Sequence, residues 1–133
     1  MENEKNLARI TLRIQSKGLL PDEISQILQM SSTKSHSKGE KMSSRNPLSA
    51  VYEENLWLLD FGEKNSFDEL FVEVGDFVQK NQNSLSTLAE KCSLDLFCGY
   101  SPKESQDSFS LDHKTLQKIA SVPVDIIFDV YSL

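Results

Sequence analysis

The chain has 133 residues, of which 38% are hydrophobic and 26% are charged, and its formal net charge at pH 7 is −6. This length and composition predict one globular domain, residues 1–133, whose core needs neither disulfides nor a metal to stabilise it. General nucleic-acid binding depends on neutralising phosphates, so the net negative charge argues against it and no nucleic-acid partner is expected. The same charge favours a basic protein partner.

The sequence shows no pattern that directs a protein to a membrane or out of the cell. No apolar run approaches the roughly 18 residues needed to span a bilayer, so no membrane association is expected. The first ten residues, MENEKNLARI, lack the apolar core of a signal peptide, and residues 1–6 are expected to be a flexible terminus. If Cys92 and Cys98 share a strand, they lie about 20 Å apart, too far for a disulfide. Free thiols favour a cytoplasmic location.

The first third of the chain predicts a strand followed by a helix. Residues 8–14, ARITLRI, alternate between apolar and polar side chains. This pattern predicts a half-buried strand that directs Arg9, Thr11 and Arg13 away from the core. A helix is expected to begin at Pro21, because the first helical position does not need an N–H group.

Residues 31–49 are rich in serine and lysine and predict an exposed loop, with a short edge strand at 33–37. A strand is expected at 56–61. It carries the only tryptophan, Trp57, which is interpreted either as a core anchor or as an aromatic platform beside a cleft. The loop contains four basic residues against one acid, but no phosphate-binding glycine pattern, and is interpreted as a solubilising segment.

The second half predicts a second and a third helix, each followed by a strand. Ser66 and Glu69 form the pattern of a capping box, and apolar residues recur at helical spacing from 67 to 78. Strands are expected at 92–100 and 124–131, a helix after Asp112, and a short strand near Phe109. The order predicts an α+β fold, with a largely antiparallel, mixed sheet and about three helices mainly covering one face.

Cys98 is a candidate nucleophile because it precedes Gly99 at the end of a predicted strand. A nucleophilic cysteine needs a base, and the only histidines are His36 in the polar loop and His113 at the start of a helix. Alternation places Cys98 on the buried side of its strand. The pattern therefore favours a core residue over a nucleophile.

Several short motifs together resemble a known bacterial family. They are ITLRI at 10–14, Thr33 with the later Lys-Gly-Glu at 38–40, Trp57, LDLFCGY at 94–100, FSL at 109–111 and VDIIFDVY at 124–131. The chain resembles the family called domain of unknown function 4279 from about residue 7 to 131. The resemblance implies a small bacterial α+β domain without an established activity. At 35–37 this chain has Ser-His-Ser, where relatives often have an aromatic residue, which argues against a shared ligand pocket there.

The first candidate site is an acidic region between residues 53 and 76, where Lys64 is the only basic residue. Its spacing matches no calcium-binding loop. The region is interpreted either as solvated surface or as a docking face for a basic partner. Its candidate residues are Glu53, Glu54, Asp60, Glu63, Glu69, Glu73 and Asp76.

The second candidate site is the outward face of the predicted sheet. Its carboxylates and arginines form either solvated ion pairs across strands or a site that binds a ligand. No nucleophile or histidine cluster accompanies these charges, so no catalytic residue is predicted. The candidate residues are Arg9, Arg13, Trp57, Asp95, Phe97, Asp125, Asp129 and Tyr131.

These observations favour a non-enzymatic binding protein without a cofactor or bound metal. Some small bacterial proteins of this kind are immunity proteins, so the leading hypothesis is an immunity-type protein that neutralises a basic toxin domain through its acidic surface. The alternative is a small-molecule-binding or enzymatic domain that uses the outward sheet face and Trp57. The sequence predicts no oligomeric state.

Overall fold

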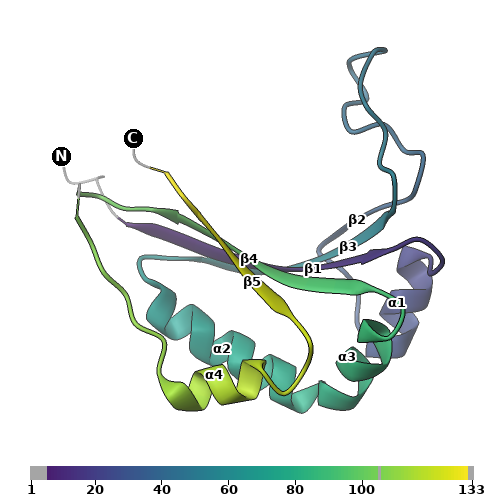
Figure 1. Cartoon of the computed structure of the whole chain (residues 1–133). Coiled ribbons are helices and arrows are strands. Elements are labelled where there is room, and N and C mark those ends of the chain that lie inside the picture. The colour runs from purple at the N-terminus through teal and green to yellow at the C-terminus, as the bar shows by residue number, and fades with distance from the viewer. Residues whose placement is uncertain (1–5, 105, 132–133) are drawn as a thin grey trace.

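A five-stranded sheet is covered on one face by helices, and no helix or strand of the described residues covers its other face (Figure 1). The computed structural model describes residues 6–104 and 106–131, so most of the expected flexible terminus lies outside the described residues. The elements, in order, are β1 (Leu7–Ser16), α1 (Pro21–Leu28), β2 (Lys34–His36), β3 (Asn55–Lys64), α2 (Phe67–Lys80), α3 (Gln82–Ala89), β4 (Ser93–Ser101), α4 (His113–Ile119) and β5 (Asp125–Val130).

The strand order is β2-β3-β1-β4-β5. All neighbours are antiparallel except β4 and β5, which are parallel. A parallel pair needs a long connection between its strands, and α4 lies within that connection. The predicted α+β fold with a largely antiparallel, mixed sheet is therefore confirmed.

The structure contains one more helix than predicted, because α3 follows α2 with only Asn81 between them. The sequence of α3, QNSLSTLA, is mostly polar and resembles a loop. Only Leu85 and Leu88 of this helix are buried. Two apolar residues are too few for the sequence periodicity to predict a helix.

The core lies between the helices and the inner face of the sheet. Alternate residues of β1, from Ala8 to Ile14, are buried there, as the sequence pattern predicted. Ser66 caps α2 by accepting a hydrogen bond from the N–H of Asp68 at 3.0 Å. Asp112 caps α4 by accepting a hydrogen bond from the N–H of Thr115 at 2.7 Å. This bond to Thr115 lowers the pKa of the Asp112 carboxyl.

Two expected features differ in detail. Between β2 and β3 the chain projects away from the sheet (Figure 1), and this exposed projection includes a bridge between Lys41 and Val51. The strand expected near Phe109 is not formed. Instead, the ring of Phe109 packs against Phe67 and Tyr100, with ring centroids 4.8 and 5.7 Å away. The segment around Phe109 is therefore held by aromatic packing and not by hydrogen bonds to a neighbouring strand.

Candidate functional site

The face of the sheet opposite the helices is the candidate site, and we call it the outer face. Among the described residues, no helix or strand covers it (Figure 1). The strand register places Thr11 beside Phe97, and Phe97 beside Ile127. The outer face is formed by Arg9, Thr11, Arg13, Leu58, Asp60, Glu63, Asp95, Phe97, Gly99, Asp125, Ile127 and Asp129.

Arg13 and Asp95 form a two-pronged ion pair across β1 and β4. The Nε and Nη2 atoms of Arg13 donate to the two carboxylate oxygens of Asp95 at 2.7 and 3.1 Å. The guanidinium carbon of Arg13 also lies 4.5 Å from the centre of the Phe97 ring. Both charged groups are half-buried, and the geometry is that of a strong, fixed pair.

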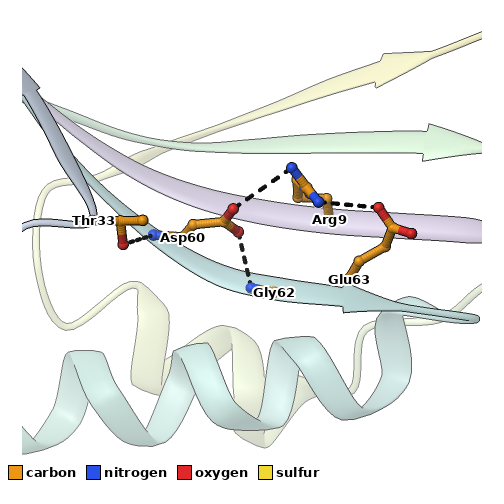
Figure 2. A network of polar contacts seen from close by, with 5 residues as sticks. All are labelled: Arg9, Thr33, Asp60, Gly62 and Glu63. Atoms are coloured by element: carbon orange, nitrogen blue, oxygen red, sulfur yellow. Dashed lines mark hydrogen bonds and ion pairs between the residues drawn. The ribbon is translucent and has the colours of Figure 1, made fainter.

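Arg9 lies between two carboxylates of β3, as Figure 2 shows. Its nitrogens are 3.6 Å from Asp60 and 3.0 Å from Glu63. Residues three apart on a regular strand point to opposite faces, but the register of β1 and β3 shifts at this point. Gly62, with φ +96°, lies in this bulge and donates its N–H to Asp60 at 2.9 Å. The bulge therefore brings both carboxylates to the outer face.

The sequence contains one sign of this bulge. Gly62 interrupts an otherwise strand-forming segment, and a glycine inside a strand often marks a bulge. The spacing of acidic residues alone groups Asp60 and Glu63 with the acids of α2 instead. The glycine between them is the signal that could have separated the two groups.

The outer face carries more acid than base. On β1, β4, β5 and the bulged end of β3, this face carries five carboxylates but only two cationic groups, the guanidinium groups of Arg9 and Arg13. Lys34 lies at the far edge, on β2. Within residues 6–104 and 106–131, no Lys, Arg or His nitrogen lies within 4.0 Å of the carboxylates of Asp125 or Asp129. Among the described residues, these two carboxylates therefore have no ion-pair partner.

A hollow of about 260 Å³ lies at one end of the outer face. Gly99 forms part of its lining, and a Cβ atom built at this residue would meet no heavy atom within 4 Å. The hollow is lined by Leu7, Ala8, Arg9, Thr11, Glu63, Phe97, Gly99, Asp129 and Tyr131.

A model of the family described as "Domain of unknown function (DUF4279)" matches residues 6–133, almost the whole chain. The chain belongs to the DUF4279 family. The resemblance carried by the short motifs is thereby confirmed. No curated protein and no solved structure is similar enough to the chain to count as a match.

In this DUF4279 chain, the acidic region of the sequence does not form one surface. Glu69, Glu73 and Asp76 lie on α2, on the helix side of the sheet, where Asp76 pairs with Lys118 at 2.7 Å. Asp60 and Glu63 lie on the outer face. Glu53 and Glu54 lie just before β3, outside both surfaces. Of the seven candidate acids, the structure brings only Asp60 and Glu63 together with the second candidate site.

The sequence pattern predicted Trp57 as part of the candidate site on the outer face, and the structure shows that this prediction is wrong. Trp57 is opposite Ile14, so it points to the inner face, where it is fully buried. Its Nε1–H donates to the hydroxyl of Ser25 at 2.9 Å. Trp57 is therefore a core anchor that joins β3 to α1. Of the other seven residues predicted for this site, six lie on the outer face, and Tyr131 lines the hollow.

The inner face also holds Cys98, which is fully buried. Burial raises the pKa of its thiol to about 12, and the negative charge of Asp95 adds to this shift. The thiol therefore remains protonated near neutral pH, which confirms the interpretation as a core residue.

The outer face offers charged, polar and apolar groups that can contact a partner or a ligand. Its described residues include carboxylates, guanidinium groups, hydroxyls and apolar side chains. The register also places His36 of β2 on this side of the sheet, where its ring lies 3.2 Å from the carboxylate of Glu40. In the part of the chain that the structure describes, no three His, Cys, Asp or Glu side chains are grouped to hold a metal ion. No helix of that part is long and apolar enough to cross a membrane.

Proposed function

We propose that this protein is a non-enzymatic binding protein that neutralises a basic protein partner, and that the outer face is its contact surface. A toxin domain is the class of partner that the sequence favours. The sequence pattern suggested the acidic region between residues 53 and 76 as the contact surface. The proposal keeps Asp60 and Glu63 of that region and moves the surface from the acids of α2 to the uncovered side of the sheet.

The observation that carries the proposal is a pair of carboxylates, Asp125 and Asp129, on the uncovered face of the sheet. In the described part of the chain no cation pairs with them, and no element covers this face. Between them lies Ile127, an exposed apolar side chain, and Phe97 lies on the neighbouring strand. Apolar side chains beside charges of one sign are suited to a partner of opposite charge, because burial supplies affinity and charge fixes the orientation.

The charge distribution supports the same partner class. The chain has a net charge of −6, so it attracts a basic protein before contact. The carboxylates of Asp60, Glu63 and Asp95 are already paired with arginines. Among the described residues of the outer face, the carboxylates without an ion pair are Asp125 and Asp129, which both lie on β5.

The test compares two triple charge reversals after the partner has been captured from the native host. In the first variant, Glu63, Asp125 and Asp129 are replaced by lysine. In the matched control, Glu69, Glu73 and Asp76 of α2 are replaced by lysine, so the net charge changes equally.

We expect the outer-face variant to slow association about tenfold more than the control at physiological salt, and to flatten its salt dependence. The gene next to that of this protein is a second indicator, since a toxin gene there supports the partner class. A captured partner that is not basic, or equal effects of the two triple variants, would contradict the proposal.

A second candidate function is the binding of a small ligand in the hollow, and the open lining at Gly99 favours it. Pockets for small ligands usually measure about 300–1,000 Å³, so this hollow of about 260 Å³ is slightly smaller than the usual range. Gly99→Leu would fill the hollow. A small molecule that raises the melting temperature of the native protein but not of this variant would support the second candidate.

A further inference from the structure

The strand β5 leaves one side of its backbone free at the edge of the sheet. Within the described residues, β5 pairs only with β4. After β5, the N–H of Tyr131 donates to the carbonyl of Tyr100 on β4 at 3.0 Å. Backbone groups of successive strand residues point to alternate sides. The N–H and C=O groups of Ile126, Phe128 and Val130 therefore point to the open side.

The opposite edge of the sheet is different. There β2 has only three residues, carries Lys34, and leads into the projection that precedes β3. Proteins commonly block edge strands in these ways, with short strands, lysines, prolines or bulges. β5 has six residues in regular register, DIIFDV, without lysine, proline or glycine. β5 is therefore a regular edge that is open to another strand, whereas the part of β3 beyond β2 contains the Gly62 bulge and ends at Lys64.

The side chains along β5 define what such a strand would contain. On the outer face, the carboxylates of Asp125 and Asp129 are four residues apart, about 13 Å along the strand. On the inner face, Phe128 and Val130 are 41% and 58% exposed, because β5 lies at the edge of the helix layer. A matching strand would carry basic side chains on one side and apolar ones on the other.

We propose that the basic partner binds by adding an extended segment to β5 as a further strand of the sheet. Two basic side chains of this segment, four residues apart, pair with Asp125 and Asp129. Its apolar side chains cover Phe128 and Val130, and its backbone bonds to the open groups of β5. This inference rests on the proposed function and specifies how the partner binds.

Charge argues against a second copy of this chain as the added strand in the register that places its aspartates opposite one another. In an antiparallel pairing of two β5 strands centred on Ile127, Asp125 of each copy faces Asp129 of the other. Like charges opposite one another destabilise a strand pair, and this pairing contains two such contacts. A basic segment replaces both repulsions by attractions.

The probe that tests the proposal is a capped nine-residue peptide, Thr-Val-Lys-Val-Thr-Val-Lys-Val-Thr. Its lysines are four residues apart and share one face when the peptide is extended. The control peptide, Thr-Val-Lys-Val-Thr-Lys-Val-Val-Thr, has the same composition but places one lysine on each face. The first measurement is amide hydrogen exchange of the native protein with each peptide in excess.

We expect the first peptide to slow exchange of the N–H groups of Ile126, Phe128 and Val130 about tenfold, and to bind about tenfold more tightly than the control peptide. The N–H of Tyr131 is already bonded to β4, so its exchange should change much less.

Two variants separate the backbone contribution from that of the side chain. Val130→Pro removes an N–H on the open side of β5 and leaves the β4 ladder intact, which an edge strand tolerates. Val130→Ala shortens the same exposed side chain but keeps the N–H. We expect Val130→Pro to weaken peptide binding about fivefold relative to Val130→Ala.

Equal affinity for the two peptides, or unchanged exchange on the open side of β5, would overturn strand addition. A dimer of the protein alone that protects these amides, and that the peptide does not dissociate, would also overturn it. If the peptides fail but the outer-face triple reversal still slows association with the captured partner, the proposed function stands without strand addition. If the triple reversal also has no effect, both proposals fail.

Discussion

The inner face of the sheet is covered by helices, whereas the outer face of the same strands is left open in the described part of the chain. Alternate residues of β1 show the difference. Ile10, Leu12 and Ile14 are buried against the helices, while Arg9 and Arg13 pair with carboxylates on the open side. Apolar packing therefore holds the inner face in place, whereas ion pairs organise the side chains of the outer face.

This difference separates stability from binding. Burying one aliphatic side chain contributes about 1.5–3 kcal/mol, whereas an exposed ion pair contributes about 0–1 kcal/mol. We therefore expect substitutions on the inner face to affect unfolding, and those on the outer face to affect partner binding with little loss of stability.

The largest effect is expected at Phe67, a fully buried residue whose ring packs against Phe71, Tyr100 and Phe109. Phe67→Ala should reduce the free energy of unfolding by about 3–5 kcal/mol, because it removes buried apolar surface and leaves a cavity. Urea unfolding measures this loss. Val72→Ala, on the exposed side of the same helix, is the control and should change stability by less than about 1 kcal/mol.

Cys98 is expected to make stability depend on alkaline pH. Its pKa in the folded state is about 12, above the usual thiol value of about 8.5 in an unfolded chain. Above about pH 9 the unfolded state loses this proton while the folded state keeps it, so stability falls as pH rises. Between pH 9 and 10.5 the wild type should lose about 1–2 kcal/mol relative to Cys98→Ala.

Equal pH dependence of the two proteins would contradict a protonated core thiol. The same core location predicts that a thiol reagent labels Cys98 slowly in the native protein and quickly after unfolding. Fast native labelling would reopen the interpretation as a nucleophile.

The two arginines of the outer face should contribute unequally. The pair of Arg13 with Asp95 is half-buried and two-pronged, while that of Arg9 with Glu63 is exposed. Double-mutant cycles with alanine should give a coupling of about 1–2 kcal/mol for the first pair and about 0–0.5 kcal/mol for the second. Equal couplings would show that burial does not distinguish the two pairs.

A small effect of opposite sign, a gain of stability, is expected at Gly99. Its backbone is not in the left-handed region, and a Cβ atom there meets no neighbour within 4 Å. Gly99→Ala should therefore stabilise the protein by about 0.5–1 kcal/mol, because glycine loses the most backbone freedom on folding. Thermal unfolding measures the change. A loss of stability would show that the lining of the hollow is more crowded than its geometry indicates.

The sequence predicted the elements whose pattern is local. β1 and β4 alternate clearly, and the apolar stripe of α2 and its Ser66 cap both appear in the structure. The direction of Trp57 was left open because LWLL, at 56–59, is apolar on both sides of the strand. Only pairing with Ile14 places Trp57 in the core.

The candidate site depended on contacts between distant segments. The acids at 60–63 and those on α2 are close in sequence, but α2 crosses to the helix side of the sheet. The bulge at Gly62 also changes the face to which the side chains on either side of it point. Local periodicity does not show that α2 packs on one side of the sheet, nor that β5 forms its edge. Both features depend on how distant strands and helices are arranged in the fold.

The outer face is proposed to be the contact surface of the protein. A methyl NMR titration of the native protein with the captured partner tests this proposal directly. Three exposed side chains report on the two sides: Ile127 on the outer face is 38% exposed, and Val72 and Leu116 on the helix layer are 50% and 41% exposed. We expect the methyl signals of Ile127 to shift or broaden on binding, while those of Val72 and Leu116 stay unchanged. Perturbation of Val72 and Leu116 with Ile127 unaffected would contradict the outer face as the contact surface.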